Sequence, residues 1–187
     1  MNQNRIHLFL SVLFLSTLAC SIFVGGPDYP EERIPISAEA VQSLQTQVEE
    51  AMLAGAQTGA VTLQITEEQL TSIMAFKTAS QENPAFTDPQ VHLREEQMRI
   101  YGRVRRGYFN ANVLIVLSVS VNEQNEPKIE VVSADFGPFP APEGLKQSIT
   151  TVVTEAYTGS LGPVATGFRL ETISIADGIM TLTGRIK

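Results

Sequence analysis

Cysteine, histidine and tryptophan are the residues that this sequence has least of. Its 187 residues include one cysteine, two histidines and no tryptophan. A single cysteine cannot close a disulfide within the chain, and the two histidines have no cysteine or carboxylate at the spacing of a metal-ligand set. We therefore expect no metal site and no cofactor.

Basic residues are also scarce. The chain has 13 lysines and arginines against 20 aspartates and glutamates, which gives a net charge of −7 at neutral pH. Proteins that bind nucleic acid need clustered cations for phosphate contacts, so we expect no nucleic-acid partner. With 43% hydrophobic and 18% charged residues, the composition is typical of a globular chain rather than a disordered or polytopic one.

The sequence lacks the common catalytic motifs as well. It has no G-x-S-x-G elbow, no P-loop and no G-x-G-x-x-G fingerprint. Adjacent glutamates occur at 31–32, 49–50, 67–68 and 95–96, and we interpret them as solvated acids rather than a glycosidase pair. His92 is expected on a strand surface and not as a general base. The protein is therefore predicted not to be an enzyme.

The N-terminus carries a short polar segment followed by an apolar run. Arg5 precedes residues 8–19, which match the 12-residue apolar core of a secretory signal. Ala19 is the small residue expected before a cleavage site, and Cys20 follows it directly. The stretch "STLAC" resembles the lipobox of bacterial lipoproteins. That resemblance implies that the signal is cut before Cys20, that the thiol of Cys20 is acylated with diacylglycerol, and that this lipid anchors the mature chain.

Two alternatives stay open for this segment. Thr17 stands where the commonest lipobox has leucine, and residues 8–24 could instead form an uncleaved anchor, since 17 uncharged residues are at the lower limit for a spanning helix. The other alternative is a buried core helix. Because Arg5 lies on the N-terminal side, both membrane-attached forms place the remainder outside the cytoplasm. We expect an extracytoplasmic protein anchored to the bacterial cell membrane by an N-terminal lipid or a single-pass anchor.

Turn-forming residues separate this leader from the rest of the chain. The stretch "GGPDYPEERIP" contains three prolines and two glycines, which is typical of a linker. The chain after it is long enough to bury a core of its own. The predicted organisation is a leader over 1–19, a linker over 20–36 and a single domain over 37–187.

Apolar periodicity within the domain indicates helices and strands in a definite order. Helical spacing predicts helices over 38–55 and 143–157, and a Thr-x-x-Gln capping box at 66–69 opens a third. Alternation predicts strands over 60–66, near 91–93, and over 98–105, 111–121 and 128–136, with a closing hairpin over 168–186 that turns at Asp177 and Gly178. We expect an α+β fold in which a curved antiparallel sheet of about six to seven strands packs against two to three helices.

Two segments resemble a known family. "VTLQITEEQLTSIM" is similar to the strand and T-E-x-x-L helix that open many extracytoplasmic lipid-binding domains, and "GFRLETISIADGIMTLTGRI" resembles their closing hairpin. Over residues 58–187 the pattern resembles the DUF2993 family, which includes the lipomannan-elongation lipoprotein type and is related to tubular lipid-binding domains. The resemblance implies a curved sheet wrapped on a helix, an apolar groove, and contact with a phospholipid or polyprenyl-type lipid. The turn at 94–97 departs from the family pattern, which commonly has glycine there.

Arginines and tyrosines gather in the stretch "RIYGRVRRGY" (99–108). Strand alternation places positions 99, 101, 103 and 105 on one face, opposite the small and apolar residues between them. Guanidinium groups match phosphate oxygens, and tyrosine suits the water–lipid boundary. The candidate headgroup or membrane-surface residues are Arg99, Tyr101, Arg103, Arg105, Arg106 and Tyr108. The alternative is a solvated sheet face whose arginines pair across strands with Glu130 and other acids.

A second candidate site is an apolar groove. A helix stripe, from 38–55 or from 143–157, is expected to pack incompletely against the long strand 111–121 and to leave a cleft. The candidate lining residues are Leu44, Val48, Met52, Val116, Phe136, Phe139, Ile149 and Val152. The predicted function is a non-catalytic, membrane-anchored lipoprotein that binds or carries a lipid or other apolar ligand at the cell envelope. The alternative is a structural or adaptor lipoprotein with a packed core and a protein partner.

Overall fold

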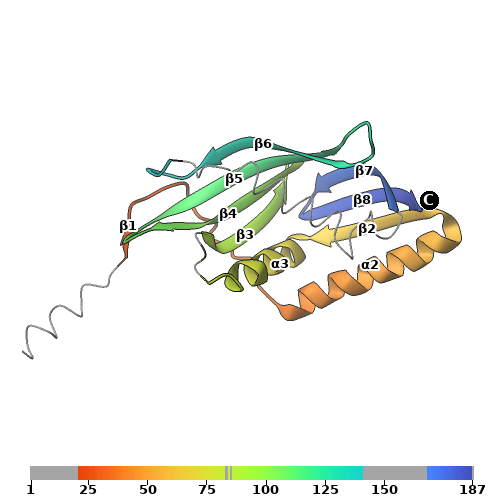
Figure 1. Ribbon diagram of the computed structural model, residues 1–187, viewed down its shortest axis with the longest axis horizontal. Coiled ribbons are helices and arrows are strands. Elements are labelled where there is room, and N and C mark those ends of the chain that lie inside the picture. The colour runs from red at the N-terminus through yellow and green to blue at the C-terminus, as the bar shows by residue number, and fades with distance from the viewer. Residues whose placement is uncertain (1–20, 83, 85, 141–167, 187) are drawn as a thin grey trace, which may run out of the picture.

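The computed structural model describes residues 21–82, 84, 86–140 and 168–186. Within these ranges the chain forms two helices and eight strands in a curled, half-barrel arrangement, which confirms the α+β class (Figure 1). The strand count slightly exceeds the prediction, and the predicted helix over 143–157 lies outside the described residues. The elements are β1 (Ile22–Phe23), α2 (Ala38–Thr58), β2 (Ala60–Thr66), α3 (Glu67–Ala79), β3 (Phe86–Arg94), β4 (Gln97–Arg106), β5 (Phe109–Val121), β6 (Pro127–Asp135), β7 (Phe168–Ala176) and β8 (Ile179–Ile186).

The strands form two sheets. The larger has the order β1-β5-β4-β3, with β6 also paired to β5, and the smaller has the order β2-β8-β7. These pairings are antiparallel, as predicted, except that β1 runs parallel to β5. Short β-hairpins account for this topology, since β3–β4, β4–β5, β5–β6 and β7–β8 are each joined by a brief turn.

Two-residue turns fix the register of the hairpins. Asp177 and Gly178 both adopt positive φ, 49° and 80°, which is the backbone of the predicted Asp-Gly turn. Glu95 and Glu96 also adopt positive φ, 53° and 61°, although neither is glycine. The turn predicted at 94–97 is therefore present, and it pairs Arg94 with Gln97 without needing a glycine.

Side-chain caps set the helix boundaries. The Ser37 hydroxyl accepts a hydrogen bond from the N–H of Ala40 at 3.1 Å, as expected for an N-cap. Thr66 and Gln69 form the predicted capping box, with bonds of 3.2 and 3.0 Å. Helix α2 continues to Thr58, beyond the predicted end at 55, because Gly59 is the residue that takes the left-handed conformation at φ 77°.

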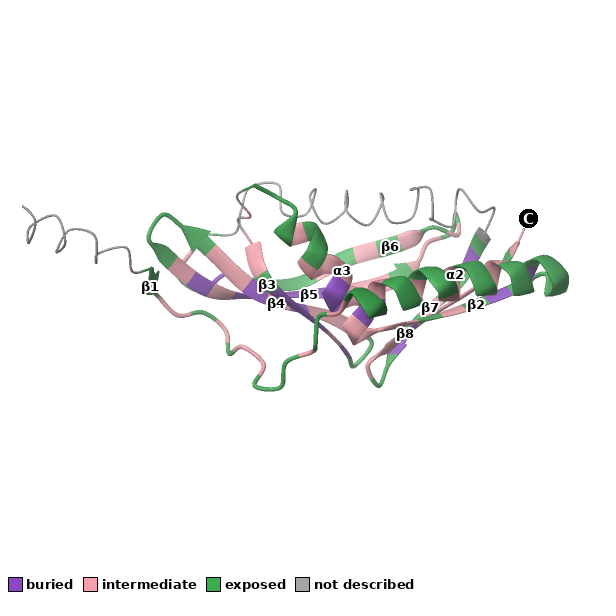
Figure 2. Cartoon of the chain, turned by 90° about the horizontal axis from the view of Figure 1, so that it is seen from below, coloured by how far each residue is buried: buried purple, intermediate pink, exposed green. Residues whose placement is uncertain are grey.

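The main core lies on the inner face of the larger sheet. Its buried side chains come from alternate positions of β3, β4 and β5, as predicted for the last two of these strands, and from the smaller sheet and the segment after β6. They run through the middle of the molecule in Figure 2. The cluster consists of Val91, Leu93, Ile100, Val113, Ile115, Leu117, Phe136, Ile175 and Met180.

Helix α2 packs against the smaller sheet. Its main contacts are with β2, β8 and α3, and it lies alongside β2 in Figure 1. Met52 packs there on a second buried cluster, formed by Val61 and Leu170, which reaches β5 at Val121. Of the two helices expected to pack against strand 111–121, α2 therefore has its main contacts elsewhere, and the one over 143–157 lies outside the described residues. The helix follows β2 because Gly59 alone separates the two elements along the chain.

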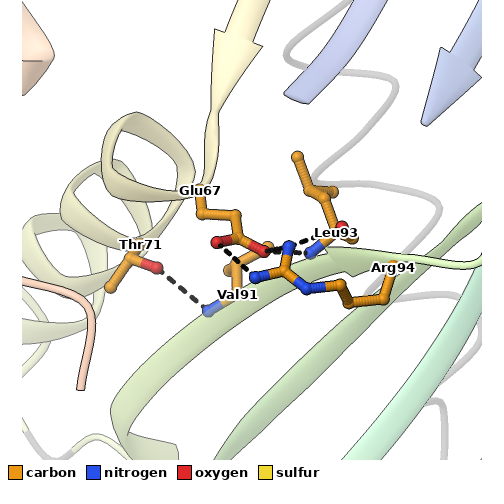
Figure 3. Close-up of polar contacts among 5 residues, drawn as sticks. All are labelled: Glu67, Thr71, Val91, Leu93 and Arg94. Carbon is orange, nitrogen blue, oxygen red and sulfur yellow. Dashed lines mark hydrogen bonds and ion pairs between the residues drawn. The ribbon is translucent and has the colours of Figure 1, made fainter. Parts of the chain in front are cut away.

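The free edge of β3 is covered by α3 (Figure 3). The N–H of Val91 donates to the hydroxyl of Thr71 at 2.9 Å, and the N–H of Leu93 donates to the carboxylate of Glu67 at 2.7 Å. Arg94 forms an ion pair with the same carboxylate. An edge strand with open N–H groups is a template for unwanted pairing, and these side chains occupy its donors. The Glu67 side chain is only 15% exposed, so our interpretation of 67–68 as solvated acids was wrong for this residue.

The turn between β7 and β8 joins the two sheets at the same place. The N–H of Gly178 donates to the carbonyl of Leu93 at 3.1 Å, and the carbonyl of Gly178 accepts from the N–H of Glu67 at 3.2 Å. The backbone of Gly178 thus bridges the edge of β3 and the first turn of α3. This bridge connects the smaller sheet to the larger one.

Candidate functional site

The first three members of the candidate headgroup set lie on the outer face of the larger sheet. Arg99 forms an ion pair with Glu95, and Arg103 forms one with Asp88 at 3.0 Å. The Tyr101 ring lies between them along β4. These arginines therefore pair with acids, as the alternative interpretation held, but Glu130 is not among their partners.

Glu130 instead forms an ion pair with Lys128 at 2.9 Å. Both residues belong to β6, which pairs with β5, whereas Arg99 and Arg103 belong to β4 on the other side of β5. The intervening strand explains why a cross-strand pair with Glu130 does not form. The acids that reach β4 come from the β3–β4 turn and from β3 itself.

The segment predicted as a linker packs across this outer face. The Tyr29 ring meets the Tyr101 ring edge-on with centroids 6.3 Å apart, and its hydroxyl donates to the carbonyl of Asp88. The guanidinium groups of Arg33 and Arg103 lie over the Tyr29 ring, at 5.1 and 5.5 Å from its centroid. Tyr29 and Arg33, in the segment predicted as a linker, therefore pack against the sheet.

Further along, the same segment is held by a side-chain amide. The oxygen of the Gln90 side chain accepts from the N–H of Ile34 at 2.6 Å, and its nitrogen donates to the carbonyl of Ile34 at 3.2 Å. This pairing imitates one step of a β-ladder. Gln90 is buried beneath the segment, and no periodic signal in the sequence separates such a glutamine from a solvent-facing one.

Two titratable groups on this face are shifted by their surroundings. Burial raises the pKa of the Tyr29 phenol, which keeps the proton that it donates to Asp88. Burial likewise lowers the pKa of His92, whose ring meets the Tyr101 ring edge-on at 5.4 Å. The Nε2 atom of His92 is buried and has no hydrogen-bond partner among the described residues. His92 lies on a strand, as predicted, but its ring is partly buried and not fully at the surface.

The other three members of the candidate headgroup set lie elsewhere, at the turn between β4 and β5. Arg105, Arg106 and Tyr108 are all exposed there. The Nε–H of Arg105 donates to the carbonyl of Gly107 at 3.2 Å, within the turn. The structure thus divides the stretch 99–108 into a covered, ion-paired part on the sheet face and an exposed part at its end.

The described members of the candidate groove do not gather in one place. Phe136 is buried in the main cluster and Phe139 packs against it, whereas Met52 belongs to the second cluster. Val116 is buried too, but it points to the outer face because its neighbours at 115 and 117 point inward. Leu44 and Val48 are half-buried on α2, and Ile149 and Val152 lie outside the described residues.

The apolar surface that the strands do share is the inner face of the larger sheet. Its positions on β3, β5 and β6, and those from 98 to 104 on β4, carry apolar side chains or glycine, whereas Arg106 occupies the last inward position of β4. At Gly102 the Phe86 ring occupies the space that a side chain would need. Phe136 and Phe139 border this face at the end of β6, where the N–H of Phe139 donates to the carbonyl of Phe136 at 3.2 Å.

Within the described ranges, no three His, Cys, Asp or Glu side chains come together as a group that could hold a metal ion. None of the helices in residues 21–82, 84, 86–140 and 168–186 combines the length and the hydropathy needed to cross a membrane.

Comparison of the chain with known proteins returned no match to a family model, to a curated protein or to a solved structure.

Proposed function

We propose that this chain is a non-catalytic, membrane-anchored extracytoplasmic protein that holds the apolar part of a lipid at the cell envelope. The observation that carries the proposal is the apolar inner face of the curled sheet, which extends over β3, β4, β5 and β6 up to the hairpin end at Arg106. Ligand sites of this class are concave and mostly apolar, with few polar groups to orient the ligand.

The membrane attachment is the second part of the proposal. The apolar segment before Ser21 and the lipobox-like "STLAC" support acylation of Cys20. A protein tethered in this way works within reach of the bilayer, where phospholipids and polyprenyl-type lipids are the abundant apolar ligands. The resemblance to the DUF2993 family supports the same ligand class.

An adaptor protein with a filled core is the second candidate. It is favoured by one observation: the inner-face residues Val91, Leu93 and Val113 are all between 0 and 2% exposed in the chain alone. A core that is filled by its own side chains has no room for an acyl chain. In that case the apolar face stabilises the fold, and the function lies in a protein partner.

Ligand capture separates the two candidates. The mature chain is purified from membranes in mild detergent and examined by native mass spectrometry, with a fluorescent fatty acyl probe in a parallel titration. A co-purifying lipid of discrete mass, together with saturable probe uptake, supports lipid binding. Bare protein and no uptake would reject the lipid-binding function and leave the adaptor.

A further inference from the structure

One end of the molecule presents large apolar side chains to solvent. They come from β1 and from the turn between β4 and β5, which lie together at the end of the sheet farthest from the C-terminus (Figure 1). Their exposed fractions range from 45 to 69%. We call this surface the hairpin tip, and it consists of Ile22, Phe23, Tyr108 and Phe109, with Arg105 and Arg106 beside them.

Backbone hydrogen bonds hold the hairpin tip open. The N–H of Ile22 donates to the carbonyl of Tyr108 at 2.7 Å, and the N–H of Val24 donates to the carbonyl of Asn110 at 2.9 Å. The Asn110 side chain also donates to the hydroxyl of Ser21 at 3.1 Å. Because both segments are fixed as strands, their apolar side chains cannot fold back onto the core.

The exposed side chains point to both sides of the sheet. Ile22 pairs with Phe109, and Phe23 pairs with Asn110, so the two neighbours in β1 face opposite ways. A protein partner that docked on one face would leave the other apolar side chains in water. A medium that surrounds the tip from all sides covers them together, and the interface of a lipid bilayer is such a medium.

The charge of the hairpin tip fits anionic lipid. Neither residues 21–27 nor residues 105–112 contain an acid, although the whole chain has a net charge of −7. Arg99 and Arg103 are paired with carboxylates, whereas Arg106 has no ion-pair partner within the part of the chain that the structure describes. Guanidinium groups bind phosphate oxygens in a forked geometry, and tyrosine is favoured where an apolar body meets a wet edge.

The direction of β1 places the anchor at the same end. Since β1 runs parallel to β5, the chain before Ile22 leaves the sheet beyond the turn that precedes Phe109. Cys20 is two positions before Ile22, and two residues span at most about 7 Å. The placement of the anchor rests on the membrane attachment in the proposed function, and it does not require the inner face of the sheet to bind lipid.

We propose that the hairpin tip inserts end-on into the interface of the membrane that holds the anchor. Phe23 and Phe109 enter the boundary between headgroups and acyl chains, and Arg105 and Arg106 bind headgroup phosphates of anionic phospholipid. The insertion fixes the orientation of the domain, with the long axis of the sheet directed away from the bilayer. The chain then meets the membrane through a defined surface rather than swinging on its tether.

The absence of tryptophan makes the test direct, because each introduced tryptophan is a unique reporter. Phe23→Trp and Phe109→Trp are made in the full anchored protein, which is reconstituted into vesicles of phosphatidylcholine and phosphatidylglycerol with brominated acyl chains. Leu53→Trp is the control, since Leu53 is 68% exposed but lies in the C-terminal half of α2 at the other end of the molecule (Figure 1). We expect a blue shift and strong quenching for both tip reporters and neither change for the control.

The outcomes that overturn the proposal are distinct. Unquenched tip reporters in protein that remains attached to the vesicles would show that the tip stays in water. Equal quenching at position 53 would show that the domain has no fixed orientation. Charge reversal by Arg105→Glu with Arg106→Glu should remove the dependence of quenching on phosphatidylglycerol, and an unchanged dependence would reject the headgroup contact.

These results do not depend on ligand capture. A protein without acyl-probe uptake but with quenched tip reporters would retain this inference and lose the lipid-binding function. An uncleaved leader leaves the inference intact as well, because a spanning segment before Ser21 also enters the bilayer beside the hairpin tip.

Discussion

The hydroxyl of Thr71 accepts a hydrogen bond of 2.9 Å from the backbone N–H of Val91, and both residues are buried. This contact joins α3 to the edge of β3 (Figure 3). The valine side chain has the shape of threonine without the hydroxyl, so Thr71→Val leaves the Val91 N–H buried and unpaired.

We expect Thr71→Val to lower the free energy of unfolding by about 1–3 kcal/mol, the cost of a buried donor without a partner. Urea denaturation monitored by circular dichroism measures the change. Thr71→Ser retains the acceptor and is the control. If Thr71→Val were no less stable than Thr71→Ser, the hydrogen bond to Val91 would not be what stabilises this contact.

Stability should fall in mild acid because of His92. Burial lowers the pKa of its imidazole in the folded chain below the usual 6.5, so the unfolded chain binds the proton more readily. The free energy of unfolding is therefore unaffected by His92 above pH 6.5, and it decreases as the pH falls from 6.5 through the pKa of the folded state. Melting temperatures measured across this range should decline less steeply for His92→Gln. If the melting temperatures of wild type and His92→Gln declined equally with pH, titratable groups other than His92 would be the cause.

Removing the Tyr29 ring should release the N-terminal segment from the sheet. The ring contacts Tyr101 and two guanidinium groups, and Arg33 is the one trypsin site within residues 21–36. Tyr29→Ala should speed tryptic cleavage after Arg33 in limited proteolysis. Tyr29→Phe keeps the ring and loses only the bond to Asp88, so it should be cleaved at an intermediate rate. Equal rates for wild type and Tyr29→Ala would mean that the other contacts of the segment, including those of Gln90, hold it without the Tyr29 ring.

Added bulk on the two sides of β5 should have different effects on lipid capture. Val113 faces the apolar inner side and Val116 the outer side, and both are buried. If the inner face holds a ligand, Val113→Phe should reduce uptake of the fluorescent acyl probe, while Val116→Phe should not. In a filled core, Val113→Phe would instead cost about 1–3 kcal/mol of stability through overpacking. Loss of stability in a protein whose wild type takes up no probe would support the adaptor.

Replacement of Cys20 tests the anchor. Cys20→Ser removes the thiol that the lipobox-like sequence presents for acylation. We expect loss of labelled-palmitate incorporation and an uncleaved or mislocalised product, detected by gel mobility and membrane fractionation. Unchanged labelling and size would favour the uncleaved anchor over residues 8–24.

Local signals in the sequence predicted the local structure well. Ser37, the capping box at Thr66 and the Asp177–Gly178 turn each act through hydrogen bonds or φ angles within a few residues, so their effect is visible in a short window. Alternation along β4 and β5 likewise identified the inward-facing residues. These features supplied the α+β class and most of the strand boundaries.

Contacts between distant segments were not visible in this way. The two-residue strand β1 is too short to show alternation, and the glycines and prolines that follow it indicate a linker when read alone. The pairing of Glu67 with Leu93 depends on where α3 docks, which periodicity does not specify. The division of the arginine stretch follows from the same cause, because Asp88 and Glu95 approach Arg103 and Arg99 only after β3 and β4 have paired.

The parallel pairing of β1 with β5 also determines how a tethered domain bears mechanical load. A pull from the membrane acts on Ser21 along the axis of β1, away from the sheet. The bonds from Ile22 to Tyr108, from Val24 to Asn110 and from Asn112 to Gly25 then resist together in shear, instead of opening one after another like a zipper. The force passes directly into β5, the long strand that lies between β4 and β6. With the anchor that we propose before Ser21, the domain would be attached through one of its most extensively paired strands, so tension on the anchor would not begin by peeling an edge of the sheet.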